Sequence, residues 1–215
     1  MVQMIWGKGM KKKSKRRAFA LLLCVVLLFF FYQELSWPGD EAVDTEIERI
    51  MIFIERYNSQ MPNCLRFRVA REIYWAASRE PNLNIPLLCG LIAHESARTW
   101  DPEIVSPAGA VGLMQILPST ARGILIFSES RDDGKEIDLP EITVKQMLCD
   151  PVINIRIGSR YLSSLIERNG LSRGLIAYYM GEARMKCLLK EKGDRIPVRA
   201  ERYLSAVFQF YSEMI

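Results

Sequence analysis

The stretch LCGLIAHES, residues 88–96, carries an apolar helical stripe that ends in an acid. Leu88, Leu91 and Ile92 fall at positions i, i+3 and i+4 of a helix, and position i+7 is Glu95. Burial disfavours the charged form of a carboxyl, so we expect Glu95 to keep its proton above the reference pKa of about 4.3. Such a carboxyl can serve as a general acid. The periodicity by itself also permits Glu95 to end the helix and point into water.

Short blocks of small and polar residues follow this helix in a definite order. They are HES at 94–96, SPAGA at 106–110, GLMQI at 112–116, PSTA at 118–121, NIRIG at 154–158 with YL at 161–162, and AYYMG at 177–181. The series resembles the lytic transglycosylases of the soluble (SLT) type, enzymes that cleave the glycan strands of bacterial peptidoglycan. The resemblance extends from about Ile85 to Tyr211. It has one clear departure, because Tyr179 stands where the family usually has Asn.

This resemblance implies an all-α fold with a lysozyme-like transglycosylase domain. Cutting a β-1,4 glycosidic bond requires protonation of the leaving oxygen and stabilisation of an oxocarbenium-like transition state, usually by two carboxylates. The blocks contain one obvious candidate, Glu95. The resemblance implies that this Glu acts first as acid and then as base on the 6-hydroxyl of the same N-acetylmuramic acid, which yields a 1,6-anhydro sugar. Because that hydroxyl is tethered, effective molarity replaces a bound water and a second carboxylate.

Five residues are expected to contact substrate. Gln115 lies in an apolar run, and a buried amide needs partners, so it either bonds sugar N-acetyl and hydroxyl groups or links parts of the core. Met114 offers an apolar contact to a sugar ring or belongs to the core. Tyr178 matches the family tyrosine whose hydroxyl would position the Glu95 carboxyl. The predicted substrate-binding set is Ser106, which matches a groove serine, with Met114, Gln115, Tyr178 and Tyr179.

Two other functions remain open at this stage. A hydrolase of the goose-type lysozyme kind would share the fold and the acid but release a reducing end. Asp101 is the residue that most favours this alternative, although its position in a Trp-Asp-Pro turn also favours a turn-forming role for the side chain. A weakly active wall-binding subunit of an envelope-spanning apparatus is the other alternative. Tyr179 favours it, since a ring with one hydroxyl replaces an amide, whereas the intact Glu95 and Gln115 argue against it.

The N-terminus has the layout of an export signal. Seven basic residues precede the first acid, Glu34, and residues 18–32 are all apolar or aromatic. The length of this run lies between that of a cleaved signal and a membrane span. We favour a retained signal anchor in the bacterial inner membrane with the domain in the periplasm; cleavage to a periplasmic form is the alternative. A lipoprotein is disfavoured, because Leu23 before Cys24 is large for a lipid-attachment site.

Composition excludes several classes of partner and cofactor. Beyond the N-terminal cluster, 22 basic residues face 25 acidic ones, so no nucleic-acid surface is expected. His94 is the only histidine and no C-x-x-C motif occurs, which argues against a zinc site, and no other cofactor is predicted. An exported domain meets oxidising conditions, so one or two disulfides and buried free thiols are both consistent with the sequence. The cysteines concerned are Cys64, Cys89, Cys149 and Cys187.

Helix signals recur along the chain, and strand-like alternation is almost absent. The expected organisation is a basic cytoplasmic segment at 1–17, a signal anchor at 18–37, a tether with extra helices at 38–84 and the SLT-type domain at 85–215. Helices are predicted to begin at Asp44 or Thr45, Asn63, Pro86, Pro151 and Pro197, and Asn169-Gly170 is predicted to end one of them. The charged stretch from Ser128 to Glu141 is interpreted as an inserted surface loop.

Overall fold

The computed structural model describes residues 38–129, 140–191 and 195–215, and these are almost entirely helical. Residues from Glu46 onward form one compact unit, which contains helices α3 to α10. The described helices are α2 (Pro38–Tyr57), α3 (Asn63–Arg79), α4 (Ile85–Glu95), α5 (Pro118–Glu129), α6 (Glu141–Leu148), α7 (Pro151–Asn169), α8 (Leu171–Met180), α9 (Glu182–Glu191) and α10 (Val198–Met214). Within these residues, the only β pairing is a pair of isolated bridges at Val111. The expectation of an all-α fold is therefore confirmed.

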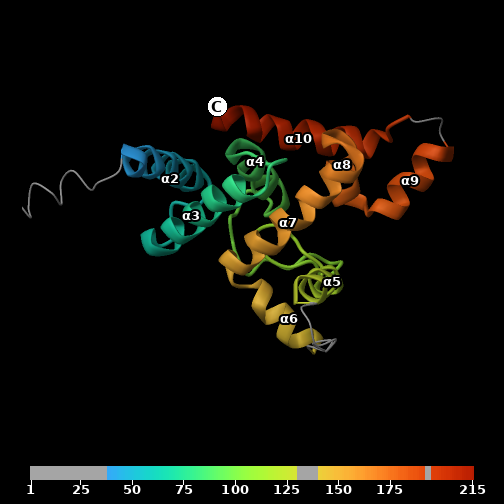
Figure 1. Ribbon diagram of the computed structural model, residues 1–215, viewed down its shortest axis with the longest axis horizontal. Helices are drawn as coiled ribbons and strands as arrows, with labels where there is room; N and C mark the ends of the chain where they lie inside the picture. Colours follow the sequence, from blue (N-terminus) through green and yellow to red (C-terminus); the bar gives the residue numbers. More distant parts are fainter. Residues whose placement is uncertain (1–37, 130–139, 192–194) are drawn as a thin grey trace, which may run out of the picture. The chain divides into compact units, whose positions relative to one another are not determined.

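Helix α4 is the buried centre of this unit. Its apolar residues from Leu87 to Ala93 are all buried, and the Asn84 side chain caps its start by accepting a hydrogen bond from Leu87 N at 2.8 Å. Helix α10 packs along α4, as Figure 1 shows. The approach is close at Gly90, where a Cβ atom would lie 2.7 Å from the carbonyl oxygen of Val207. Glycine at this position thus allows α10 to reach the acid at the end of α4.

Helix α7 supports the unit from the other side and packs against α3 and α8. Asp150 caps it by accepting hydrogen bonds from Val152 N and Ile153 N, with Pro151 at the first position. The helix ends at Asn169, and Gly170 follows with φ of 77°. These are the boundaries that the sequence predicts, because each depends on neighbouring residues.

The α3–α7 contact carries an ion-pair network around one buried carboxylate. Glu72 on α3 accepts hydrogen bonds from Arg156 Nε and Nη2, at 3.1 and 3.0 Å, and from Arg79 at 2.6 Å. The hydrogen bonds to Glu72 raise the pKa of Arg156. Two cations therefore compensate the burial of Glu72, which is 6% exposed.

One predicted boundary is wrong. The first described helix begins at Pro38, rather than at a cap formed by Asp44 or Thr45. The Thr45 hydroxyl donates to the carbonyl oxygen of Glu41 four residues earlier, at 2.7 Å. Its hydrogen-bonding capacity is thus used inside the helix, so it does not stop the helix at this point.

Several sequence predictions fall on other parts of the chain. The basic cluster and the apolar run at 18–32 lie outside the described residues, as do positions 130–139 of the expected surface loop. Among the helices that the structure describes, none combines the length and apolar character that a membrane crossing requires.

All four cysteines considered above are free thiols, and Cys89 is fully buried in α4.

Candidate active site

Glu95 lies at the last position of α4, immediately before a tightly turned segment. Ala97, Arg98 and Trp100 all have positive φ, between 51° and 68°. The turn is stabilised by the Ser96 hydroxyl, which accepts a hydrogen bond from Trp100 N at 3.2 Å, and by the fully buried Trp100 ring. Left-handed backbone at three non-glycine residues is costly and concentrates at functional sites. The chain thus turns away at once and leaves the Glu95 carboxyl at the end of the helix.

The Glu95 carboxyl is partly buried and bonded to one tyrosine. Tyr203 on α10 donates its hydroxyl to Glu95 Oε1 at 2.9 Å. Burial raises the pKa of Glu95 from its ordinary value of 4.5 to about 7, although the Tyr203 hydrogen bond opposes the shift. The expectation of a raised pKa is confirmed. At neutral pH about half of the Glu95 carboxyl groups keep a proton, as a general acid requires.

If Glu95 is the general acid of glycan cleavage, as the resemblance implies, its raised pKa predicts that cleavage declines above neutral pH. The acid must carry its proton in the resting enzyme, so kcat/KM should fall about tenfold for each pH unit above about 7. The measurement is initial rates on soluble glycan fragments between pH 5 and pH 9, with circular dichroism at each pH as a control for folding. A decline already complete by pH 6 would show that the acid has an ordinary carboxyl pKa.

Tyr203 lies where three helices meet. Its ring is 3% exposed, the ring of His94 on α4 meets it edge-on at 4.9 Å, and Tyr179 on α8 stacks on it at 4.6 Å with an angle of 19°. Burial and the nearby Glu95 charge raise the pKa of Tyr203 well above 10. The sequence reasoning missed this residue. A signal was present, because Tyr203 lies in the buried stripe of α10 with Val207 and Phe210, and a buried hydroxyl needs a partner.

Two of the predicted roles are wrong. The Tyr178 hydroxyl donates to the backbone carbonyl of Met114 at 2.7 Å, so it holds the 112–116 segment while Tyr203 bonds Glu95. Tyr178 is still close, since the Glu95 charge helps raise its pKa. The Met114 side chain is fully buried and cannot meet a sugar ring. It packs against Gly158 on α7, where a Cβ atom would come within 2.6 Å of its sulfur.

Gln115 has a structural use that limits its contact with substrate. Its Nε2 donates to the carbonyl oxygens of Gly112 at 2.9 Å and Ile104 at 3.2 Å, and its φ is 48°. Among the described residues no donor bonds its carbonyl oxygen Oε1, which leaves that atom for a ligand. Ser106 likewise stabilises the loop, since its hydroxyl accepts from Ala110 N at 3.0 Å. Both residues therefore shape the backbone at the site.

Asn154 on α7 is fully buried, and its side chain anchors the 112–116 segment. Its Oδ1 accepts a hydrogen bond from Met114 N at 2.8 Å, and its Nδ2 donates to the carbonyl oxygens of Val111 at 2.9 Å and Leu148 at 3.0 Å. Gly112 has φ of 79°, and a Cβ atom there would lie 2.3 Å from Asn154 Nδ2. The glycine and the amide thus form one fitted unit under the loop.

A pocket of about 260 Å³ opens beside this segment. It brings together Gln115, Tyr178 and Tyr179 of the predicted set, whereas Ser106 and Met114 do not line it. Its wall consists of Gln115, Ile116, Leu117, Thr120, Tyr161, Tyr178, Tyr179, Met180 and Gly181. Tyr179 lines the pocket, whereas Glu95 and Tyr203 do not, and the Tyr179 ring stacks on the ring of Tyr203.

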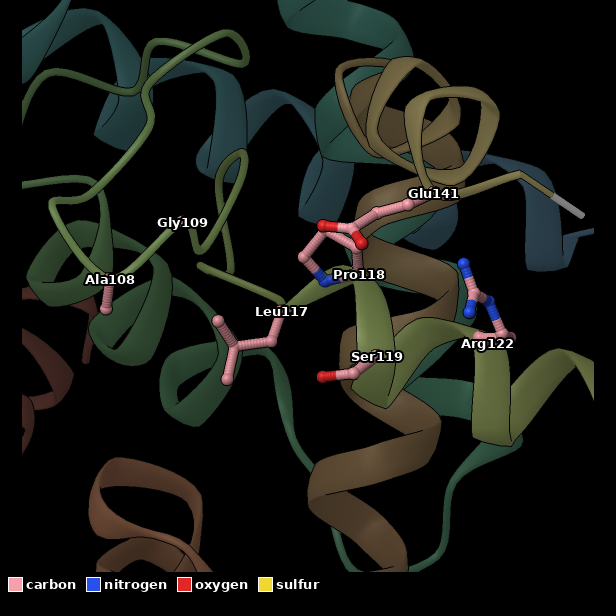
Figure 2. A pocket seen from close by; sticks show the side chains of 7 residues that line it. All are labelled: Ala108, Gly109, Leu117, Pro118, Ser119, Arg122 and Glu141. Atoms are coloured by element: carbon pink, nitrogen blue, oxygen red, sulfur yellow. The ribbon is translucent and has the colours of Figure 1, made fainter.

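A second pocket of about 230 Å³ shares Leu117 with the first, and Figure 2 shows the residues that line it. Its wall consists of Ala108, Gly109, Leu117, Pro118, Ser119, Arg122 and Glu141. Figure 2 shows side chains from α5 and from the start of α6 around this hollow. The Arg122 Nε is buried and has no hydrogen-bond partner among the described residues. The two pockets thus meet at the exposed side chain of Leu117, and together they are called the cleft below.

Asp101 has the turn-forming role that its sequence context favours. Its Oδ1 accepts a hydrogen bond from Glu103 N at 2.9 Å, which makes an Asx turn at an exposed position. No cluster of metal-binding side chains occurs among the described residues. Of the Asp101 and Glu95 carboxyls, Glu95 is therefore the candidate general acid.

Comparison with known proteins agrees with this arrangement. Residues 73–197 match the family model of the Transglycosylase SLT domain. The chain is 32% identical over 114 residues to the soluble lytic murein transglycosylase of Escherichia coli K12, covering 52% of this chain and 16% of that protein. It is 30% identical over 111 residues to the transglycosylase of Enterobacteria phage PRD1, covering 51% of this chain and 34% of that protein.

The solved structure of an inactive mutant of lytic transglycosylase Slt from Pseudomonas aeruginosa shares the fold. Its TM-score is 0.51 at 22% identity, over 66% of this chain and 23% of that one. The chain spans about a sixth of the length of the E. coli relative and a third of the phage relative. The family model covers more than half of the chain, from α3 to the residue before α10. This protein belongs to the transglycosylase SLT family.

Proposed function

We propose that this protein is a peptidoglycan lytic transglycosylase, which cleaves the β-1,4 bond between N-acetylmuramic acid and N-acetylglucosamine and forms a 1,6-anhydro-muramyl product. The observation that carries the proposal is the Glu95 carboxyl. Its pKa is about 7, and the Tyr203 hydroxyl bonds it. The Tyr203 ring stacks on Tyr179, which lines a pocket together with Gln115 and Tyr178. The family membership supports the substrate class.

In the first step, Glu95 donates its proton to the glycosidic oxygen while the bond to the anomeric carbon breaks. The N-acetylglucosamine residue leaves with that proton, and positive charge develops on the muramyl ring. Glu95 is now a carboxylate, and the Tyr203 hydroxyl at 2.9 Å stabilises its charge. This bond strengthens as the proton leaves, so it favours the transition state over the resting acid.

In the second step, the Glu95 carboxylate takes the proton of the 6-hydroxyl of the same muramyl residue. The freed oxygen attacks the anomeric carbon and closes the 1,6-anhydro ring. Water is neither consumed nor released, and Glu95 regains its proton for the next cycle. The Glu95 pKa is set by burial and by the Tyr203 hydrogen bond, and no second carboxylate contributes to it. A nucleophile within the substrate fits a site with one carboxylate, because the substrate itself holds that hydroxyl in place.

The pocket supplies groups for sugar binding. The free Oε1 of Gln115 can accept from an N-acetyl N–H or a hydroxyl, and Tyr179 offers an aromatic face. In the second pocket, the Arg122 side chain and the Ser119 hydroxyl are available to bind a further sugar of the glycan. The first pocket thus offers an amide oxygen and an aromatic face to a sugar, and the second offers a guanidinium and a hydroxyl.

The decisive experiment is to incubate the full-length protein with purified peptidoglycan and identify the released fragments by mass spectrometry. We expect muropeptides with 1,6-anhydro ends, each 18 Da lighter than its hydrolysed counterpart because no water is added. Reducing muropeptides would instead make the protein a hydrolase. The exposed Asx-turn geometry of Asp101 gives that alternative no positioned second carboxylate.

A further inference from the structure

Tyr179 is the residue at which this chain departs from its family's Ala-Tyr-Asn-x-Gly block. It lies one position before the end of α8, and the turn that follows is held by the hydrogen bond from Gly181 N to the carbonyl oxygen of Ala177, at 2.8 Å. Its side chain is 45% exposed, so its ring has not simply been absorbed into the core. One side of it lines the cleft and the other meets Tyr203.

Among the described residues, the Tyr203 hydroxyl bonds Glu95, and the rings of His94 and Tyr179 contact the Tyr203 ring. His94 meets it edge-on, at an interplanar angle of 84°. Tyr179 covers one of its faces, with ring centroids 4.6 Å apart and nearly parallel planes. The stack therefore restricts the rotation of the Tyr203 ring and, with it, the direction of the hydroxyl.

We propose that Tyr179 is a positioning residue, which holds Tyr203 in the orientation that bonds Glu95. This inference rests on the proposed function and adds to it a role for the ring that replaces the family's amide. An Asn at position 179 has no aromatic face and too little surface to cover Tyr203. The ring thus acts on the acid through Tyr203 rather than through the sugar.

A double-mutant cycle tests this route of action. Tyr179→Asn, Tyr203→Phe and the double variant are prepared in the full-length protein, and kcat and KM are measured on soluble glycan fragments. We expect Tyr179→Asn to lower kcat about 3- to 10-fold with KM nearly unchanged, which corresponds to the loss of one aromatic contact. In the Tyr203→Phe background, where no hydroxyl remains to be positioned, Tyr179→Asn should cost less than about twofold.

Two further variants control for trivial effects. Tyr179→Phe keeps the ring and loses the hydroxyl, so it should restore most of the kcat that Tyr179→Asn loses. Trp75→Asn removes an equally exposed ring, also 45%, from α3, where it contacts Tyr74. It should leave kcat unchanged, and thermal unfolding of all variants reports any loss of stability.

Three outcomes would overturn the proposal. They are equal losses from Tyr179→Asn in both backgrounds, a loss confined to KM, which would make the ring a direct sugar contact, and failure of Tyr179→Phe to restore kcat.

A crystal structure of Tyr179→Asn gives a readout that needs no turnover. We expect the distance from the Tyr203 hydroxyl to Glu95 Oε1 to exceed a hydrogen bond or the Tyr203 ring to rotate, and an unchanged bond near 2.9 Å would overturn the proposal. If the unmutated protein releases no anhydro products, the proposed function fails, whereas this structural test of Tyr179 still stands.

Discussion

Replacing Glu95 with Gln is expected to lower the rate of glycan cleavage by at least about 10³-fold, since one carboxyl serves as both acid and base. The Gln side chain has nearly the same shape, and its amide oxygen can still accept the Tyr203 hydroxyl that now bonds Oε1 at 2.9 Å. It has no proton to donate to the glycosidic oxygen. The measurement is the rate of release of anhydro-muropeptides by the variant and by the unmutated protein at pH 6.

The same substitution is expected to increase stability above neutral pH. The Glu95 pKa is raised from 4.5 to about 7 in the folded protein, so the folded state binds more protons than the unfolded state between these values. The free energy of unfolding therefore falls as pH rises through this window, by about 3 kcal/mol. Glu95→Gln removes that loss, so at pH 8 it should unfold at higher urea concentration than the unmutated protein.

A matched control separates the acid from charge loss in general. Glu103 lies on the exposed segment after α4, and Glu103→Gln changes the net charge by the same amount. We expect it to leave both turnover and the pH dependence of stability unchanged. Substantial turnover by Glu95→Gln, in a sample that folds normally, would mean that another group donates the proton.

The parts of this fold that could be predicted are those that depend on neighbouring residues. The starts of α3, α7 and α10 follow Pro-containing or Asn-containing signals, and Asn169-Gly170 ends α7 as expected. The acid could be recognised because the stripe that precedes it is local, and the structure buries Leu88, Leu91 and Ile92 completely. The predicted helix start at Asp44 or Thr45 is wrong. The Thr45 hydroxyl donates to a backbone carbonyl within the helix and does not cap its start.

The partners of the acid could not be predicted in the same way. Tyr203 lies 108 residues from Glu95, and only the packing of α10 on α4 joins them. Tyr178 lies in the more conspicuous block, yet its hydroxyl is bonded to Met114. Gln115 and Met114 are adjacent in a loop with positive φ, so no helical or strand period indicates which of them faces the cleft. Their placement depends on contacts with α7 and α8.

Replacing Asn154 with Leu is expected to lower the free energy of unfolding by about 3–5 kcal/mol, which is the largest stability effect among the substitutions considered. The side chain is fully buried and bonds three backbone groups. The apolar variant leaves Met114 N and the Leu148 carbonyl oxygen without this partner, whereas the Val111 carbonyl oxygen keeps its bond from Ile116 N at 3.0 Å. The measurement is urea unfolding followed by circular dichroism. Asn58→Ala is the control, because Asn58 makes a single bond, to the carbonyl oxygen of Thr99, at a more exposed position, and should lose about 1 kcal/mol or less.

Gly112 belongs to the same loop and packs directly against the Asn154 side chain. A Cβ atom there would overlap Asn154 Nδ2, so Gly112→Ala must displace the amide that anchors the loop, in addition to straining a backbone with φ of 79°. The two substitutions share one cause, so the double variant should be destabilised by clearly less than the sum of the single effects. Additive effects, or a loss below about 1 kcal/mol for Asn154→Leu, would show that other contacts anchor the loop. Because Gln115 and the carbonyl that bonds Tyr178 belong to the same loop, folded samples of Asn154→Leu should also cleave glycan more slowly.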